Sequence, residues 1–252
     1  MQQPASMLAI SRKHYDAVLL DLDGVITDTA SLHAACWKKM FDEYLQNRAR
    51  ETGEAFRAFD IATDYRLYVD GKPRFDSVRD FLRSRDIRLP EGSPDDRPEA
   101  VTVAGLGNRK NDLVNKIIQQ VGVRPYEGTV KLIHQLRQRG FKIAVVTSSQ
   151  NCSAVLKAAE LDALFDLQVD GNVIHERHLA GKPAPDTFLI AAQLLGVEPA
   201  RAIVIEDALS GVQAGLNGNF GLVIGVARKG NAEELRHEGA HLVVNDLSEL
   251  VD

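Results

Sequence analysis

The chain has 252 residues, of which 44% are hydrophobic and 26% charged, an ordinary globular composition that allows one large domain or two linked ones. Its formal net charge of −5 argues against a nucleic-acid or anionic-membrane partner, and no apolar run approaches the ~20 residues that would span a bilayer. Cys36 and Cys152 lie far apart without metal-ligand spacing, and the N-terminal stretch lacks a signal-peptide layout, so we expect a cytoplasmic protein with reduced cysteines.

The first predicted element is a strand at residues 17–20, a continuous apolar run typical of a strand buried on both faces of a parallel sheet. No convincing strand follows until well past residue 120. Instead, helical patterns occur at 34–45, 75–83 and 108–121, and a polar, turn-rich segment at 90–99 interrupts them. We therefore predict an α-helical cap domain at 33–123, inserted after the first strand. Since doubly wound folds bind ligands at the carboxyl edge of the sheet, this cap would act as a lid there.

From Gly128 onward, helical and strand patterns alternate. A helix is predicted around Val130, Ile133 and Leu136, which share one face, and Gly140 follows as its end signal. Further apolar strands are predicted at 143–146, 203–205, 222–226 and 242–244, and helices at about 151–160, 185–195, 209–217 and 231–237. This series predicts an α/β fold with a doubly wound parallel sheet, a Rossmann-like core formed by residues 1–32 and 124–252.

Acidic pairs follow two of the predicted strands. Asp21 and Asp23 come directly after the first strand, and Gly24 lets the chain turn sharply there. The same pattern occurs in plain turns and in calcium loops, but the further acidic ligands and final Glu of an EF-hand loop are missing. Glu206 and Asp207 follow the strand at 203–205. Carboxylates suit Mg²⁺, which would offset the repulsion when a carboxylate attacks a phosphate.

Phosphoryl transfer also needs donors for the phosphate oxygens and a cation that balances the spreading charge. Thr147, Ser148 and Ser149 end the strand at 143–146 in hydroxyl groups, just before a helix start suited to anions. Lys182 lies in a loop between a glycine and a proline. Taken singly, the hydroxyls could be an ordinary helix N-cap and the lysine a solvated side chain. Their joint order along the chain, acid pair, hydroxyls, lysine and acid pair, favours an active site.

These four groups resemble the four motifs of the haloacid-dehalogenase-like (HAD) phosphotransferase superfamily, over roughly residues 15–245. The resemblance implies that Asp21 becomes an aspartyl phosphate, and that Asp23 protonates the leaving group and then deprotonates the next acceptor. It also implies that Thr147 and Lys182 complete the catalytic set. Mg²⁺ would be held by Asp21, the backbone carbonyl of Asp23, Glu206 and Asp207. True haloacid dehalogenases lack the second aspartate of the first motif, so Asp23 argues against that activity.

Further features resemble the β-phosphoglucomutase subfamily. These are the first motif followed by Ala30 and His33, Arg74 after a glycine, the run Arg109-Lys110-Asn111-Asp112, and Asn151 after the hydroxyls. The resemblance implies that Arg74 grips the non-transferring phosphate, which suits a guanidinium because its fork can bond a dianion bidentately. The substrate-binding residues it implies are His33, Arg74, Lys110, Ser148, Ser149 and Asn151. Alternatively, Arg74 and Lys110 are simply exposed charges of the cap.

Two departures from the subfamily bear on the substrate. The cap has an extra loop at 90–103, and Gln150 stands where a lysine is expected. We expect a monomer that acts on a small sugar phosphate and interconverts β-glucose 1-phosphate and glucose 6-phosphate through a bisphosphate. The first alternative is a Mg²⁺-dependent phosphatase of sugar or other small phosphates. The second is a non-catalytic regulatory domain, against which the full set of acids and Lys182 speaks.

Overall fold

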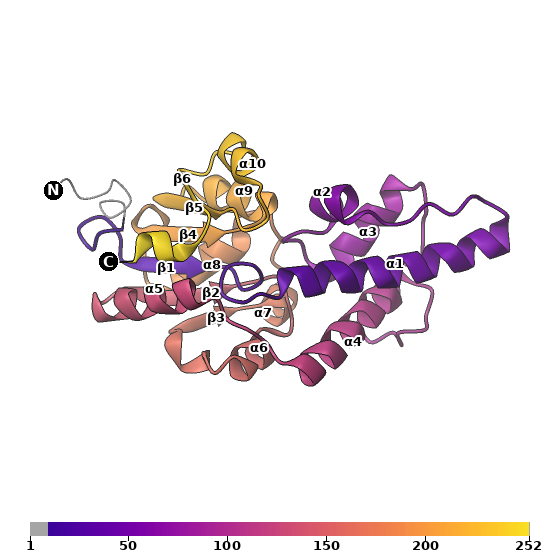
Figure 1. Cartoon of the computed structure of the whole chain (residues 1–252), viewed down its shortest axis with the longest axis horizontal. Helices are drawn as coiled ribbons and strands as arrows, with labels where there is room; N and C mark the ends of the chain where they lie inside the picture. The colour runs from indigo at the N-terminus through magenta and orange to yellow at the C-terminus, as the bar shows by residue number, and fades with distance from the viewer. Residues whose placement is uncertain (1–9, 252) are drawn as a thin grey trace. The chain divides into compact units, whose positions relative to one another are not determined.

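The computed structural model describes residues 10–251 (Figure 1). The chain divides into two compact units, here called the helical unit, Thr29–Gly122, and the sheet unit, which comprises the residues before and after it. The helical unit begins at Thr29, earlier than the expected residue 33, because helix α1 (Ala30–Thr52) starts directly after it. It ends at Gly122, one residue before the expected 123. Residues 1–9 and 252, assigned to the core from the sequence, lie outside the described residues.

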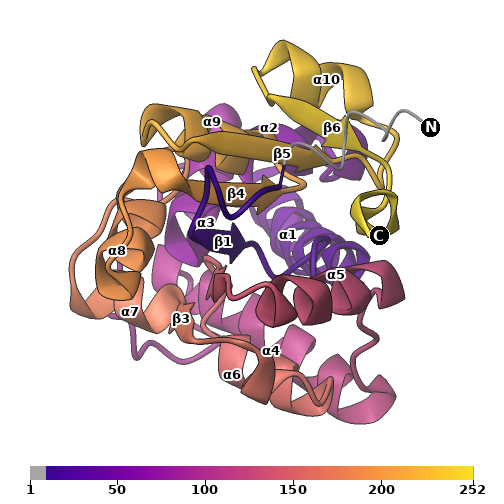
Figure 2. The same ribbon diagram turned by 90° about the vertical axis from the view of Figure 1, so that its left-hand side faces the viewer.

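The sheet unit is built on a six-stranded sheet in the order β3-β2-β1-β4-β5-β6, in which every neighbouring pair is parallel (Figure 2). The strands are β1 (Ala17–Leu20), β2 (Lys142–Val146), β3 (Leu167–Val169), β4 (Ala202–Glu206), β5 (Leu222–Val226) and β6 (Leu242–Val244). The predicted doubly wound parallel α/β fold is thus confirmed. Strand β3 was not among the predicted strands.

The direction of chain progression reverses at β1. From β1 the chain moves outward through β2 to β3, whereas β4 returns to the other side of β1 and the chain then continues to β6. Leu20, the last residue of β1, is level with Val145 of β2 and with Ile205 of β4. The three central strands therefore end at the same edge, at a switch point where open α/β sheets bind their ligands.

Helices cover both faces of the sheet. They are α5 (Glu127–Gln138), α6 (Cys152–Ala158), α7 (Gly171–Glu176), α8 (Asp186–Leu195), α9 (Leu209–Asn217) and α10 (Ala232–His237). Figure 2 shows α5 on the opposite face from α8 and α9. On the α8 face, Leu19, Val146 and Val204 of adjacent strands pack with Phe188 of α8 and Val212 of α9. Gly140 has φ +78° after the end of α5, as its predicted end signal requires.

The helical unit packs around an aromatic core. Its helices are α1, α2 (Arg66–Tyr68), α3 (Arg74–Ser84) and α4 (Val103–Val121), with a π-helical turn at Ile61–Tyr65. The ring centroid of Phe41 lies 5.3 Å from that of Trp37, 5.1 Å from that of Phe59 and 4.2 Å from that of Phe81. These contacts join α1, α3 and the segment between them. Across residues 10–251, no helix combines the length and the apolar character needed to cross a bilayer.

The extra loop of the helical unit is held by side chains of α4. Arg109 Nε donates to the carbonyl oxygen of Pro98 at 2.7 Å. Asn108 Nδ2 donates to the carbonyl oxygens of Pro94 and Asp96, at 2.9 and 2.8 Å. Thr102 Oγ1 bonds the Asp96 carboxylate at 2.6 Å, just before α4 begins. The turn-rich segment predicted at 90–99 thus has no helix or strand of its own, yet it is fixed in place by these bonds.

Candidate active site

The ammonium group of Lys182 joins the ends of the three central strands. Lys182 Nζ lies 2.6 Å from Asp21 Oδ1 after β1 and 2.5 Å from Glu206 Oε1 at the end of β4. It also donates to the carbonyl oxygen of Val146, the last residue of β2, at 3.2 Å. Three of the four predicted motifs, far apart in the sequence, therefore meet at one ammonium group.

This cluster is almost closed to water. The Lys182 side chain has no exposed surface, and the carboxylates of Asp21 and Glu206 are 10% and 1% exposed. Burial raises the pKa of Asp21 well above its usual range, although the Lys182 charge acts in the opposite direction. Burial likewise raises the pKa of Glu206. Burial alone would lower the pKa of Lys182, but the charges of Asp21 and Glu206 outweigh it and raise that pKa. The lysine thus stays charged and offsets the two carboxylates.

Two glycines allow other parts of the chain to approach the acidic pair after β4. Gly24 has φ +89°, and a Cβ atom built there would lie 2.2 Å from Asp207 Oδ2. A Cβ atom on Gly211 of α9 would lie 2.0 Å from the Glu206 carboxylate. A side chain at residue 24 would meet Asp207, so the close approach of the turns after β1 and β4 depends on Gly24. Gly211 in turn lets α9 lie against the Glu206 carboxylate.

The same turns form a group of ligands that could hold a metal ion. One carboxylate oxygen each from Asp21, Glu206 and Asp207 lies within 4.8 Å of the others, and all three residues are buried. Oxygen ligands of this kind fit a hard divalent cation such as Mg²⁺. Glu206 Oε2 already accepts from the backbone N–H groups of Asp207 and Ala208, at 3.0 and 3.2 Å. Asp207 Oδ2 lies 2.8 Å from Lys229 Nζ. Sequence reasoning gave Lys229 no role.

Asp23 lies on the turn between Asp21 and Gly24 and is half-buried. Its charge is among those that raise the pKa of Asp21, after burial and the Glu206 charge. Asp23 is therefore near the predicted nucleophile and is less buried than it. A proton carrier that must exchange protons with substrate needs such access.

The hydroxyl loop after β2 is shaped by its own side chains. Thr147 Oγ1 accepts from the backbone N–H of Ser149 at 3.1 Å, and Ser149 Oγ accepts from that of Asn151 at 3.2 Å. The backbone N–H of Thr147 donates to the carbonyl oxygen of Val169 at 2.9 Å. The unpredicted strand β3 therefore anchors the loop that contains Thr147, Ser148, Ser149 and Asn151.

The predicted substrate residues of the helical unit come from three helices. Lys110 of α4 is 5% exposed, and its Nζ lies 2.9 Å from Nδ1 of the buried His33 on α1. The same Nζ lies 4.8 Å from the ring centroid of Trp37. Arg74 begins α3 and is half-buried beside Gly107 of α4, where a Cβ atom would lie 3.2 Å from Arg74 Cγ. The alternative that Lys110 is a plain exposed charge is therefore wrong.

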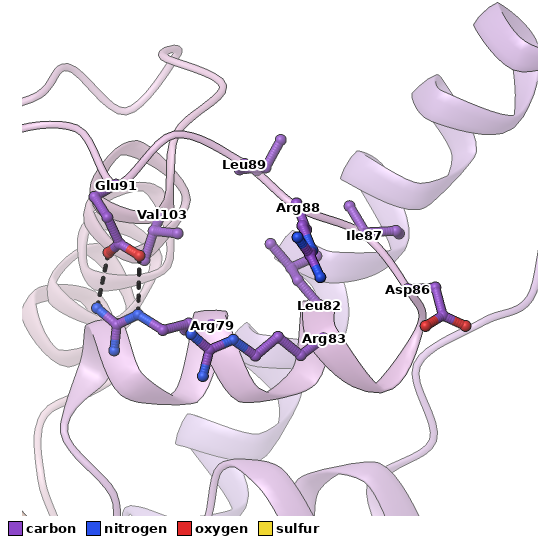
Figure 3. Close-up of a pocket in the computed structure, with 9 residues that line it drawn as sticks. All are labelled: Arg79, Leu82, Arg83, Asp86, Ile87, Arg88, Leu89, Glu91 and Val103. Atoms are coloured by element: carbon purple, nitrogen blue, oxygen red, sulfur yellow. Dashed lines mark hydrogen bonds and ion pairs between the residues drawn. The ribbon is translucent and has the colours of Figure 1, made fainter.

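The helical unit also contains a hollow of about 780 Å³ between α3 and residues 86–91 (Figure 3). Leu82 and Val103 are among its lining residues, and at one end Arg79 bonds both oxygens of Glu91, at 3.0 and 2.8 Å. None of the residues predicted to act in catalysis or substrate binding lines it. The residues predicted for catalysis lie instead at the sheet edge, where Lys182 contacts Asp21 and Glu206.

Residues 15–219 match the family model of the haloacid dehalogenase-like hydrolases. The chain belongs to this family. It is 53% identical over 238 residues to the β-phosphoglucomutase of Mycobacterium bovis, an alignment that covers 93% of this chain and 91% of that protein. It is also 38% identical to part of an uncharacterized glycosyl hydrolase of Mycobacterium tuberculosis, covering 95% of this chain and 18% of that protein. A crystal structure of β-phosphoglucomutase from Clostridium difficile superposes with a TM-score of 0.72 at 26% identity, over 94% of this chain and 93% of that one.

The resemblance predicted from the sequence, to the haloacid dehalogenase-like family and its β-phosphoglucomutase subfamily, is thus confirmed. As a member of this family, the chain is a phosphoryl-transfer enzyme. The roles of the individual site residues, the identity of the metal ion, a lid function of the helical unit, a monomeric state and a cytoplasmic location stay predictions.

Proposed function

We propose that this enzyme interconverts β-glucose 1-phosphate and glucose 6-phosphate through a bisphosphorylated sugar. The observation that carries the proposal is the 53% identity to a β-phosphoglucomutase over nearly the whole length of both chains. The Asp21–Lys182–Glu206 cluster supports it independently, because it supplies a carboxylate nucleophile beside a fixed cation.

In the proposed cycle, phosphorylated Asp21 gives its phosphoryl group to the free hydroxyl of the sugar phosphate. Asp23 takes the proton of that hydroxyl as the new oxygen–phosphorus bond forms and the bond to Asp21 breaks. The resulting bisphosphate then presents its other phosphate. An Asp21 oxygen attacks that phosphorus, and Asp23 returns the proton to the departing sugar oxygen. The second transfer regenerates phosphorylated Asp21 and leaves the isomeric sugar phosphate.

The chain's own groups prepare these transfers. Lys182 offsets the charge of Asp21 and Glu206, so an anionic phosphate can approach a buried carboxylate. The Thr147, Ser148, Ser149 and Asn151 loop would donate to the phosphate oxygens. In the helical unit, His33, Lys110 and Arg74 would bind the sugar and its second phosphate.

We assign Mg²⁺ to the carboxylates of Asp21 and Asp207 and to the backbone carbonyl of Asp23. Bound there, the ion would neutralise part of the negative charge of the phosphoryl group. Glu206 remains a candidate ligand. Because its oxygens already accept from Lys182 and two backbone N–H groups, we propose that it acts chiefly by fixing Lys182.

A phosphatase is the second candidate, because the matching family model is that of hydrolases. Water would then replace the sugar hydroxyl as acceptor. A phosphatase of single phosphates has no need for a second phosphate site, so the burial of Lys110 against His33 and the position of Arg74 favour the mutase.

The two reactions differ in their products. With Mg²⁺, β-glucose 1-phosphate and a trace of the bisphosphate, we expect glucose 6-phosphate to form in large excess over inorganic phosphate. Asp21→Asn should abolish both products, whereas Asp162→Asn, at an exposed position, should leave them unchanged. Predominant release of inorganic phosphate would establish the phosphatase, and absence of both products in the wild-type protein would contradict both activities.

A further inference from the structure

The segment after β5 lies against both acidic turns of the site. Arg228 Nε donates to the carbonyl oxygen of Gly24 at 3.2 Å. Lys229 forms its ion pair with Asp207, and Asn231 Nδ2 donates to the Asp207 carbonyl oxygen at 3.3 Å. This short stretch, which neither the predicted motifs nor the proposed cycle uses, thus contacts the turn after β1 and the turn after β4.

Arg228 is itself held firmly. Its side chain is 13% exposed and pairs with the carboxylate of Asp246. Its guanidinium carbon lies 3.6 Å from the ring centroid of Tyr126, and Nη2 donates to Thr129 Oγ1 at 3.3 Å. A guanidinium with several bonds and a stacked ring has little freedom to leave its place.

The partners of Arg228 hold the rest of the same turn. Thr129 Oγ1 donates to the carbonyl oxygen of Val25 at 2.7 Å. The Tyr126 hydroxyl donates to Asp28 Oδ1 at 3.0 Å. The turn from Gly24 to Asp28 is therefore fixed at several points by groups that converge on one guanidinium.

We propose that Arg228 is a positioning residue that holds the turn of Asp23 in its reactive geometry. Gly24 follows Asp23 directly and has no side chain, so its backbone carbonyl is the group by which Arg228 can fix it. That carbonyl belongs to the Gly24–Val25 peptide, and the Gly24 N–H donates to the Thr27 carbonyl oxygen at 2.8 Å, so the two bonds hold Gly24 from both sides. With φ +89°, Gly24 has more conformational freedom than its neighbours, so loss of the Arg228 bond would loosen the turn on the far side of the residue that follows Asp23. The inference rests on the proposed role of Asp23 in proton transfer.

A purely structural role would make a different prediction. The ion pair with Asp246 could stabilise the C-terminal turn without any effect on Asp23. Lysine can keep a charge near Asp246, but a single ammonium cannot reproduce the separate Nε bond to Gly24. Arg228→Lys therefore separates the two roles, and Arg228→Met removes both. Arg236→Met is the matched control, since Arg236 also pairs with a carboxylate, that of Glu233 at 2.6 Å, but at an exposed position on α10.

The experiment compares two leaving groups. A sugar hydroxyl needs a proton from Asp23 as it departs, whereas p-nitrophenolate needs little protonation. For Arg228→Lys and Arg228→Met we expect kcat with the sugar phosphate to fall by roughly 10- to 100-fold, the scale of a misplaced catalytic group, with little change in KM. The release of p-nitrophenolate in the first turnover, which forms phosphorylated Asp21 and does not require attack by an acceptor, should slow by less than about threefold. Arg228→Lys should melt close to wild type, and Arg236→Met should match wild type throughout.

Equal losses on the two substrates, or full recovery of sugar-phosphate kcat in Arg228→Lys, would overturn the proposal and leave Arg228 as a support of the fold. The difference between the rate losses on the two substrates can be measured whether the wild-type enzyme makes glucose 6-phosphate or inorganic phosphate. Failure of the mutase assignment is therefore distinguishable from failure of this inference.

Discussion

At the scale of single residues, the site depends on a lysine with no exposed surface that contacts two carboxylates. Such a cluster is balanced only while all its members are present. Removal of one member of a buried ion pair typically costs ~3–5 kcal/mol, because the remaining charge is buried without a partner. Because Lys182 offsets the charge of two acids, its loss should lower both the stability of the fold and the rate of turnover.

We expect Lys182→Met to lower the free energy of unfolding by roughly that amount and to reduce turnover by at least ~10²-fold, since the charge near the phosphoryl group is lost. Denaturant unfolding and steady-state assays would measure both effects. Lys131→Met, at an exposed site on α5, is the matched control and should behave as wild type. Wild-type stability and turnover in Lys182→Met would show that the lysine is not part of the site.

Most of the core residues found by sequence share one property, a reactive side chain placed after an apolar strand. Asp21 and Glu206 were predicted in this way, whereas Lys182 was predicted from its loop between a glycine and a proline. The structure brings the three together. Arg228 and Lys229 were missed because they follow β5 in a loop without an acid pair or hydroxyl run. Arg228 contacts the Gly24 carbonyl, about 200 positions away in the sequence, and Lys229 contacts the Asp207 carboxylate, about 20 positions away. Contacts between residues so far apart in the sequence cannot be predicted from a local sequence pattern.

At the scale of elements, strand prediction succeeded where a run was continuous and buried. Strands β1, β5 and β6 have the predicted bounds. Strand β2 begins one residue earlier than predicted, and β4 is longer than predicted by one residue at each end. Strand β3 was missed because it has three residues with a glutamine at its centre and lies half-exposed at the sheet edge. Helix α1 extends well beyond the predicted 34–45, since its last turns are polar and exposed and show no apolar periodicity. Helix α7, absent from the prediction, is short and begins with a glycine, and the Asp170 side chain caps it.

At the amino edge of the sheet, an ion pair between the segments before β1 and β4 should make the stability of the fold depend on pH. Asp16, which precedes β1, accepts from Arg201 Nη2 at 3.0 Å, just before β4, and from Arg12 Nη1 at 2.7 Å. The bonds from Arg201, with the charges of both arginines, hold the pKa of Asp16 below its usual value. A carboxylate with a lowered pKa stabilises the fold above its unfolded pKa of about 3.9, and this contribution is lost as the pH falls through the folded value.

Asp16→Asn should therefore melt below wild type at pH 7, and the difference in melting temperature should shrink as the pH falls below about 4. Thermal unfolding at a series of pH values would measure this. Asp162→Asn, at an exposed acid of the sheet unit that is not among the partners of Arg12 or Arg201, should show no such dependence. A difference for Asp16→Asn that stays constant down to pH 3 would show that the ion pair does not link β1 to β4.

At the scale of the whole molecule, the mutase assignment needs the helical unit as well as the sheet unit. A bisphosphate must be held by one phosphate near Asp21 while the other is bound elsewhere. Arg74, half-buried at the start of α3 and 4.9 Å from the Phe75 ring, is our candidate for that second site. Burial lowers its pKa, although the Asp112 charge opposes the shift, so a dianion would gain a partly desolvated donor.

Arg74→Ala should remove charge-assisted hydrogen bonds worth about 1.5–3 kcal/mol and reduce mutase kcat/KM by roughly 10- to 150-fold. Turnover of p-nitrophenyl phosphate should barely change, because that substrate has no second phosphate. Arg74→Lys should recover part of the loss, since an ammonium lacks the fork. Arg50→Ala, an exposed arginine of α1, serves as control. Equal losses on both substrates would indicate a folding defect of the helical unit instead.

The central claim is that the phosphoryl group passes through Asp21. Its most direct test is to mix the enzyme with the sugar bisphosphate and Mg²⁺, stop the reaction rapidly in acid, and locate the phosphoryl group by mass spectrometry of peptides. We predict one phosphoryl group, on the peptide that contains Asp21. When the bisphosphate carries an isotopic label in its phosphates, the label on Asp21 should pass into glucose 6-phosphate once unlabelled β-glucose 1-phosphate is added before the acid. Asp21→Asn should carry none. A phosphoryl group on any other residue, or turnover of sugar phosphate with none on Asp21, would contradict the account.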